Sequence, residues 1–207
     1  MRRFARLTVS DDNATAETPA PQTLGASVDS TQNHVYFYRD INADTCLSLM
    51  KALREVDTGL YYDRMAYNLP DDYPHIPIYL HIQSDGGDAF ASLQLADYIK
   101  TLKSPVYSIV EGCACSGATI VSAACEKRYI TPNAFLMIHQ VSSFAWGTYE
   151  QFKDEVKLLD MIMQKLTAFY QQHSDMTPET IAEALKHDTW MDAQMAIDAG
   201  LVDEVWQ

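Results

Sequence analysis

The sequence has few basic residues and no long apolar segment. It holds 15 Lys and Arg against 28 Asp and Glu, a formal net charge of −13. Binding to a nucleic acid backbone needs clustered basic side chains, so this balance argues against a nucleic acid partner. No apolar run approaches the roughly 20 residues that cross a bilayer, and no signal-peptide segment follows Arg2, Arg3 and Arg6. We therefore expect a soluble, non-secreted, cytoplasmic protein without a membrane partner.

Cysteine is also scarce, with only Cys46, Cys113, Cys115 and Cys125. None lies in a Cys-x-x-Cys pair, and no His has zinc-finger spacing from them. We expect free thiols in a reducing compartment, with Cys113 and Cys115 as small apolar fillers. The phosphate-binding pattern GxxxxGK[ST] is absent as well. The sequence thus predicts neither a metal site nor a cofactor or nucleotide site.

Residues 34–207 carry alternating strand and helix patterns, whereas residues 1–33 are polar and predict a mobile tail or a removable leader. The predicted strands are 34–38, 77–83, 105–110, 128–131, 135–138 and 201–205. Predicted helices begin at Asn42, after Gly87, at Ala118, at Thr148 (ending near Gln172), at Pro178 and after Asp192, and residues 57–75 predict a loop. Alternating strands and helices favour an α/β fold.

One stretch has the layout of a nucleophile turn. The segment EGCACSGATIV places Ser116 among small residues, between an apolar strand and an apolar helix. Such a turn exposes a hydroxyl, and the free N–H groups at the start of the helix can stabilise developing negative charge. By itself the pattern is more often a packing site, so it needs support from other residues.

His139 and Asp188 can complete a catalytic set with Ser116. His139 follows a predicted strand and can act as the base, and Asp188 follows a predicted helix and can orient the imidazole. Backbone N–H groups of Gly86 and Gly117 can form an oxyanion hole. Taken singly, each residue is more often a structural hydrogen-bonder, a helix cap or a plain turn. Together they favour nucleophilic catalysis.

Four segments resemble the caseinolytic protease family, ClpP: IYLHIQSDGGDAFASLQLADYI, GCACSGA, FLMIHQ and AIDAGLVDEV. The resemblance covers about residues 34–207. It implies a ClpP/crotonase-like fold of repeated β-β-α units with a projecting handle helix. By matching position it implies Ser116 as nucleophile, His139 as base, Asp188 as the third triad residue, and Gly86 and Gly117 as oxyanion donors.

The resemblance also implies a function and partners. It implies a serine endopeptidase that cleaves unfolded polypeptides inside stacked rings of its own subunits, fed by an AAA+ unfoldase. That partner uses ATP, so this chain needs no cofactor. The alternatives are a non-catalytic ring subunit and, less favoured, a crotonase-type acyl-CoA enzyme. The sequence departs from the family pattern at Asp85, where Pro is usual, at Gly117, where Met is common, and after Gln140.

The helix predicted from Thr148 carries an apolar seam for a packed partner. Its residues recur at spacings of 4, 3, 4, 3 and 4: Phe152, Val156, Leu159, Met163, Leu166 and Tyr170. Packing on its own domain would explain the seam about as well. The family resemblance favours the handle through which two rings meet.

Overall fold

The computed structural model describes residues 28–70 and 72–207. The predicted mobile tail lies mostly outside this range. Its last part is a strand, β1 (Asp29–Thr31), which pairs antiparallel with β2 (His34–Phe37). Regular structure is therefore present before residue 34, where the sequence placed the start of the domain. The run Asp29–Thr31 is short and polar, so its sequence does not predict a strand. It forms a strand because it pairs with β2.

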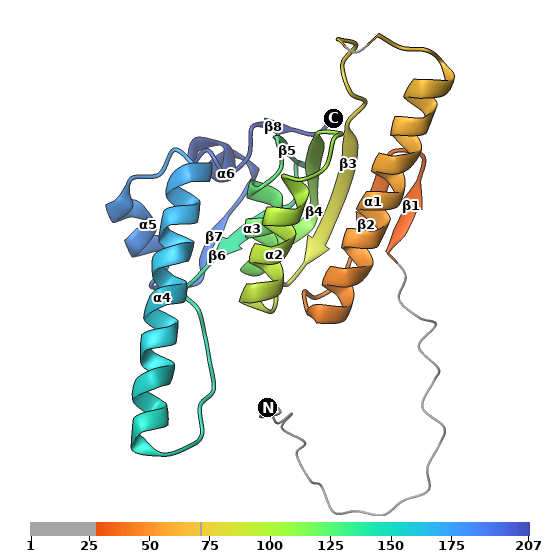
Figure 1. Cartoon of the computed structure of the whole chain (residues 1–207). Helices are drawn as coiled ribbons and strands as arrows, with labels where there is room; N and C mark the ends of the chain where they lie inside the picture. Colours follow the sequence, from red (N-terminus) through yellow and green to blue (C-terminus); the bar gives the residue numbers. More distant parts are fainter. Residues whose placement is uncertain (1–27, 71) are drawn as a thin grey trace, which may run out of the picture.

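A sheet with the strand order β1-β2-β3-β4-β5-β8 forms the centre of the molecule (Figure 1). From β2 onward the neighbours are parallel: β3 (Ile78–Ser84), β4 (Val106–Cys115), β5 (Lys127–Ile130) and β8 (Glu204–Val205). Beyond this path, β6 (Phe135–Ile138) pairs with the end of β4, and β7 (Thr189–Met191) pairs antiparallel with β6. The predicted α/β fold is confirmed.

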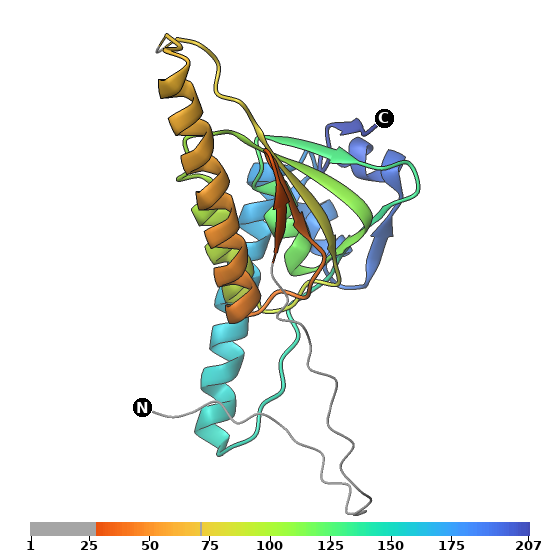
Figure 2. The same ribbon diagram turned by 90° about the vertical axis from the view of Figure 1, so that its right-hand side faces the viewer.

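Helices α1 (Ala43–Ala66), α2 (Ala89–Ile99) and α3 (Gly117–Ala123) lie along one face of this sheet (Figure 2). Alternate strand residues such as Leu80 and Ile82 are fully buried between these layers. The opposite face carries aromatic rings in edge-to-face contact, among them Tyr79, Tyr107 and Tyr129. Side-chain alternation along each strand thus separates an aliphatic core from an aromatic face.

Helix α1 is longer than the sequence suggested. The prediction of a loop over residues 57–75 is wrong up to Ala66, because the helix continues to that residue. Val56 is the last buried residue of the helix, so the apolar periodicity stops there although the helix continues to Ala66. After the helix, the Arg64 guanidinium donates to the carbonyl oxygens of Tyr73 and Pro70 and closes the following turn.

Strand β4 also extends further than expected, through Gly112 to Cys115. The partners of β4 change from Ile82–Val110 to Ser84–Ala114, so two more residues lie on β4 than on β3 between these pairs. Gly112 has a φ of +72°, which glycine adopts without steric cost. Gly112, which lies in the segment that the sequence suggested as a turn, is therefore part of a β-bulge inside a long strand.

Helix α4 (Tyr149–His173) begins where the sequence predicted, with a capping box of Thr148 and Gln151. Its C-terminal half packs on its own domain through Ile162, Leu166 and Tyr170, whereas Phe152 is exposed. In Figure 1 the N-terminal half projects away from the sheet. The seam is thus divided: its C-terminal part is core, and only its N-terminal part is free for a partner.

The chain closes with α5 (Pro178–Ala184) and α6 (Ala193–Asp198), which lie before and after β7. Thr177 and Asp192 cap these helices, which begin where the sequence predicted. None of the helices in the described ranges combines the length and the apolar character needed to cross a membrane.

Candidate active site

Ser116 lies at the junction between β4 and α3. Its φ of +53° is rare for a residue with a side chain, so the turn must be held by its surroundings. The Ser116 N–H donates to the carbonyl of Met137 on β6 at 2.7 Å. The Thr119 hydroxyl and N–H both donate to the Ser116 carbonyl. These bonds fix the backbone in a form that exposes the hydroxyl.

His139 lies within hydrogen-bonding distance of this hydroxyl. Its Nε2 is 2.8 Å from Ser116 Oγ, and its Nδ1 is 3.5 Å from Asp188 Oδ1. The pairing of β6 with β7 explains this arrangement, because His139 follows Ile138 and Asp188 precedes its partner Thr189. The structure therefore brings the three predicted residues into the order Ser–His–Asp. The Asp188 side chain is 71% exposed, so water screens the ion pair.

The glycine turn after β3 packs directly on the serine. A Cβ atom added to Gly86 would lie 2.4 Å from the Cys115 carbonyl and 2.8 Å from Ser116 Cβ. However, the Gly86 N–H donates to Ser84 Oγ at 3.1 Å and is buried with it. The expected oxyanion role of Gly86 is thus not supported. Gly87 is exposed and lines the cavity at Ser116.

Gly117 forms the other side of the site. It is the first residue of α3, where a backbone N–H has no partner within the helix. The position is also tightly packed, since a Cβ atom here would lie 2.1 Å from the hydroxyl oxygen of Ser92 on α2. Glycine thus lets α2 and α3 approach each other beside the nucleophile.

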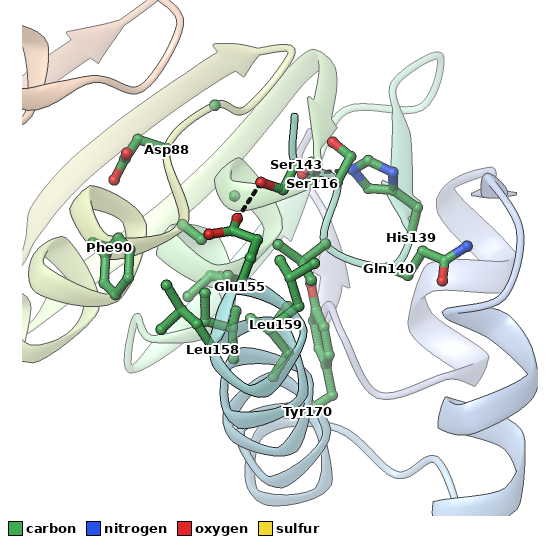
Figure 3. Close-up of a pocket in the computed structure, with 18 residues that line it drawn as sticks. Asp88, Phe90, Ser116, His139, Gln140, Ser143, Glu155, Leu158, Leu159 and Tyr170 are labelled. Atoms are coloured by element: carbon green, nitrogen blue, oxygen red, sulfur yellow. Dashed lines mark hydrogen bonds between the residues drawn. The ribbon is translucent and has the colours of Figure 1, made fainter. Parts of the chain in front are cut away.

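A cavity of about 390 Å³ opens beside the Ser116 hydroxyl (Figure 3). One wall is formed by the chain after β6, including Ser143, which donates to Glu155 of α4. The other wall is apolar and includes Leu158 and Leu159 of α4. Sequence reasoning missed this wall, because it placed Leu159 in a seam for another subunit. Helical spacing alone does not show which face of a helix meets a cavity.

The four cysteines are free thiols, as predicted. Burial raises the pKa of Cys115 to about 12, and burial is also the main cause of a raised pKa for Cys113. Both thiols are therefore protonated at neutral pH in the unliganded chain. Neither is a nucleophile competing with Ser116.

Comparison with known proteins identifies relatives of this chain. The model of the Clp protease family matches residues 31–207. The ATP-dependent Clp protease proteolytic subunit 2 of Treponema denticola is 30% identical over 62% of this chain and 66% of its own length. The proteolytic subunit of Bdellovibrio bacteriovorus is 34% identical over 65% of this chain and 66% of its own length. The matched segment thus spans about two thirds of these relatives.

A solved structure supports the fold. A ClpP1 mutant from Listeria monocytogenes superposes with a TM-score of 0.71 at 24% identity, covering 85% of this chain and 92% of that one. The predicted ClpP/crotonase-like fold is confirmed. Because the family model matches nearly all of the described residues, the chain belongs to the Clp protease family.

Proposed function

We propose that the chain is a serine endopeptidase in which Ser116, His139 and Asp188 form a catalytic triad. The observation that carries this proposal is the 2.8 Å distance between Ser116 Oγ and His139 Nε2, at a strained turn that opens into a cavity. A nucleophile and a base within hydrogen-bonding reach are the minimum requirement for acyl transfer.

Acylation follows from these positions. Ser116 Oγ attacks the peptide carbonyl carbon while His139 Nε2 accepts the hydroxyl proton. The negative charge that develops on the carbonyl oxygen is stabilised by the N–H groups of Gly117 and Gly87. The C–N bond then breaks, and His139 returns the proton to the leaving amine. Water, activated by the same imidazole, hydrolyses the acyl-enzyme.

Asp188 orients the imidazole and stabilises the imidazolium. Its 3.5 Å distance from His139 Nδ1 is longer than a strong hydrogen bond, and its side chain is largely exposed. Catalytic hydrogen bonds are often long without substrate and tighten in the substrate complex. Asp188 therefore contributes most when substrate or a neighbouring subunit removes water from the site.

The surroundings of the site support polypeptide as the substrate class. The apolar wall from α4 suits the side chain of an extended peptide. The relatives named above are proteolytic subunits of ATP-dependent proteases. On that ground we propose self-association into stacked rings around a chamber and delivery of unfolded polypeptide by an AAA+ unfoldase.

Hydrolysis of a fluorogenic peptide by Ser116→Ala tests the proposal. The variant should lose at least about 10⁴-fold in kcat. Ser143→Ala is the matched control, because this second serine lines the same cavity but donates its hydroxyl to Glu155, and it should retain activity. Ser116→Ala activity equal to the wild type would exclude the mechanism. A wild type without activity would favour the non-catalytic ring subunit, the alternative that the open His139–Asp188 pair supports.

A further inference from the structure

Three side chains with metal-binding atoms meet beside the nucleophile, on the sheet face that α1 and α2 leave uncovered. Within the described residues, Asp85, Cys113 and Cys115 are the one group of three such side chains whose ligand atoms all lie within 4.8 Å of one another. Cys113 Sγ lies 3.6 Å from Asp85 Oδ1. None of the three side chains takes part in the proposed peptidase chemistry.

The backbone explains why the three meet. Cys113 and Cys115 are two residues apart on β4, so both side chains lie on the same face of the sheet. Their middle neighbour, Ala114, is paired with Ser84, which places Asp85 beside Cys115. The bulge at Gly112 shifts the end of β4 and creates this register. The group is therefore set by strand pairing, not by side chains of a free loop.

The spacing suits a tetrahedral zinc ion. Bonds of about 2.3 Å to sulfur and about 2.0 Å to oxygen at tetrahedral angles separate sulfur from oxygen by about 3.5 Å and two sulfurs by about 3.8 Å. The Cys113–Asp85 distance of 3.6 Å already matches the first value. Rotation of side chains can bring the remaining atoms from within 4.8 Å to these separations.

The chemistry of the group also selects the ion. Two thiolates and one carboxylate favour a borderline-soft divalent cation and disfavour Mg²⁺ or Ca²⁺, which prefer oxygen. Asp85 is exposed and Cys115 is buried, so an ion can enter from solvent and keep a water as its fourth ligand. The formal net charge of −13 further favours a cation over an anion.

We propose that Asp85, Cys113 and Cys115 bind one Zn²⁺ ion per chain. Binding converts both thiols to thiolates and releases two protons to solvent. The ion joins the residue before Gly86 to the residue before Ser116, and so connects the two turns that form the peptidase site. This proposal replaces the sequence-based expectation that the two cysteines are apolar fillers, and it does not depend on peptidase activity.

Metal titration of the full chain tests the site. The protein is reduced with a phosphine, freed of metal with a chelator, and titrated with Co²⁺ and then with Zn²⁺. One equivalent of Co²⁺ should produce a thiolate-to-cobalt charge-transfer band, which one equivalent of Zn²⁺ should abolish. Zn²⁺ should also raise the melting temperature, because it binds the folded form.

Variants locate the ion. Cys113→Ser should weaken the charge-transfer band and lower the Zn²⁺ affinity by at least about 100-fold, since even partners outside the coordination shell cost about 10- to 100-fold. Asp85→Asn should lower the affinity while it preserves both thiols. Cys125→Ser is the matched control, because this buried thiol lies outside the group, and it should bind as the wild type does. Melting curves without metal confirm that each variant is folded.

Three outcomes would overturn the assignment. The first is the absence of a charge-transfer band in the reduced wild type. The second is a band that Cys113→Ser and Asp85→Asn leave unchanged. The third is loss of binding in Cys125→Ser but not in Cys113→Ser, which would place the ion elsewhere.

Discussion

Gly117→Ala is the substitution whose outcome the packing around the nucleophile determines most directly. A Cβ atom at this position would lie 2.1 Å from Ser92 Oγ and 3.2 Å from Ser92 Cβ. Ser92 is fully buried, and its hydroxyl donates to the Asp88 carbonyl at 2.8 Å. The serine must therefore lose this bond or push α2 away from α3. Either change should cost about 1–3 kcal/mol of folding free energy.

A second substitution should remove the conflict. Ser92→Gly deletes both atoms that the new methyl group would meet, and by itself should cost about 1 kcal/mol through lower helix propensity and the lost hydrogen bond. In that background Gly117→Ala should be neutral or stabilising. The double-mutant cycle should show a favourable coupling of about 1–3 kcal/mol.

Chemical denaturation followed by circular dichroism measures the cycle. Gly59→Ala in α1 is the matched control: a Cβ atom there meets nothing within 4 Å, so the variant should gain about 0.5–1 kcal/mol. Peptide hydrolysis should fall in Gly117→Ala and recover in the double variant, because the Gly117 N–H is the proposed oxyanion donor. A Gly117→Ala variant as stable as the wild type, or one whose cost Ser92→Gly leaves unchanged, would refute this reasoning.

Three further predictions follow from other parts of the molecule. Asp188→Asn should lower kcat by at least about 100-fold with little change in KM. The loss in kcat should be smaller than the ~10⁴-fold loss for a buried triad Asp, because Asp188 is largely exposed. Unchanged kinetics would show that Asp188 has no part in catalysis. Phe152→Glu with Val156→Glu on the projecting half of α4 should reduce the assembled mass in sedimentation, and a full-size particle would remove this face from the ring contact. Burial and the neighbouring His81 lower the pKa of His34 in the folded chain. The His34 imidazole therefore binds a proton more readily in the unfolded chain, and the free energy of unfolding should fall as the pH drops below about 6.5. His34→Gln should weaken that dependence in melting curves, and an unchanged dependence would assign it to other groups.

The sequence located Ser116 and His139 because each follows a strand, and strand ends of a parallel sheet meet at one edge. It could not show how Asp188 reaches His139. That contact depends on the pairing of β6 with β7, and Thr189–Met191 is too short a run to predict a strand. The local pattern offered Asp188 only as a carboxylate that follows a predicted helix, and the family resemblance then supported the same residue.

Glycine positions show a second limit of sequence reasoning. Gly112 favours a positive φ, but a turn and a bulge both use such a residue, so the end of β4 was misplaced. Gly86 and Gly87 are adjacent and alike in sequence. Only the structure shows that the Gly86 N–H donates to the Ser84 hydroxyl, whereas Gly87 lies beside the cavity. The projection of α4 depends in the same way on tertiary packing.

The most direct test of the central claim is the identity of the residue that reacts with a serine-directed fluorophosphonate. The assembled wild-type protein is treated with the reagent, hydrolysis of a fluorogenic peptide is followed over time, and the modified residue is identified by peptide mass spectrometry. The proposed triad predicts a single adduct on Ser116, formed at the rate at which activity is lost, and no adduct in His139→Ala on the same timescale. An adduct on another serine, or loss of activity without modification of Ser116, would contradict the account.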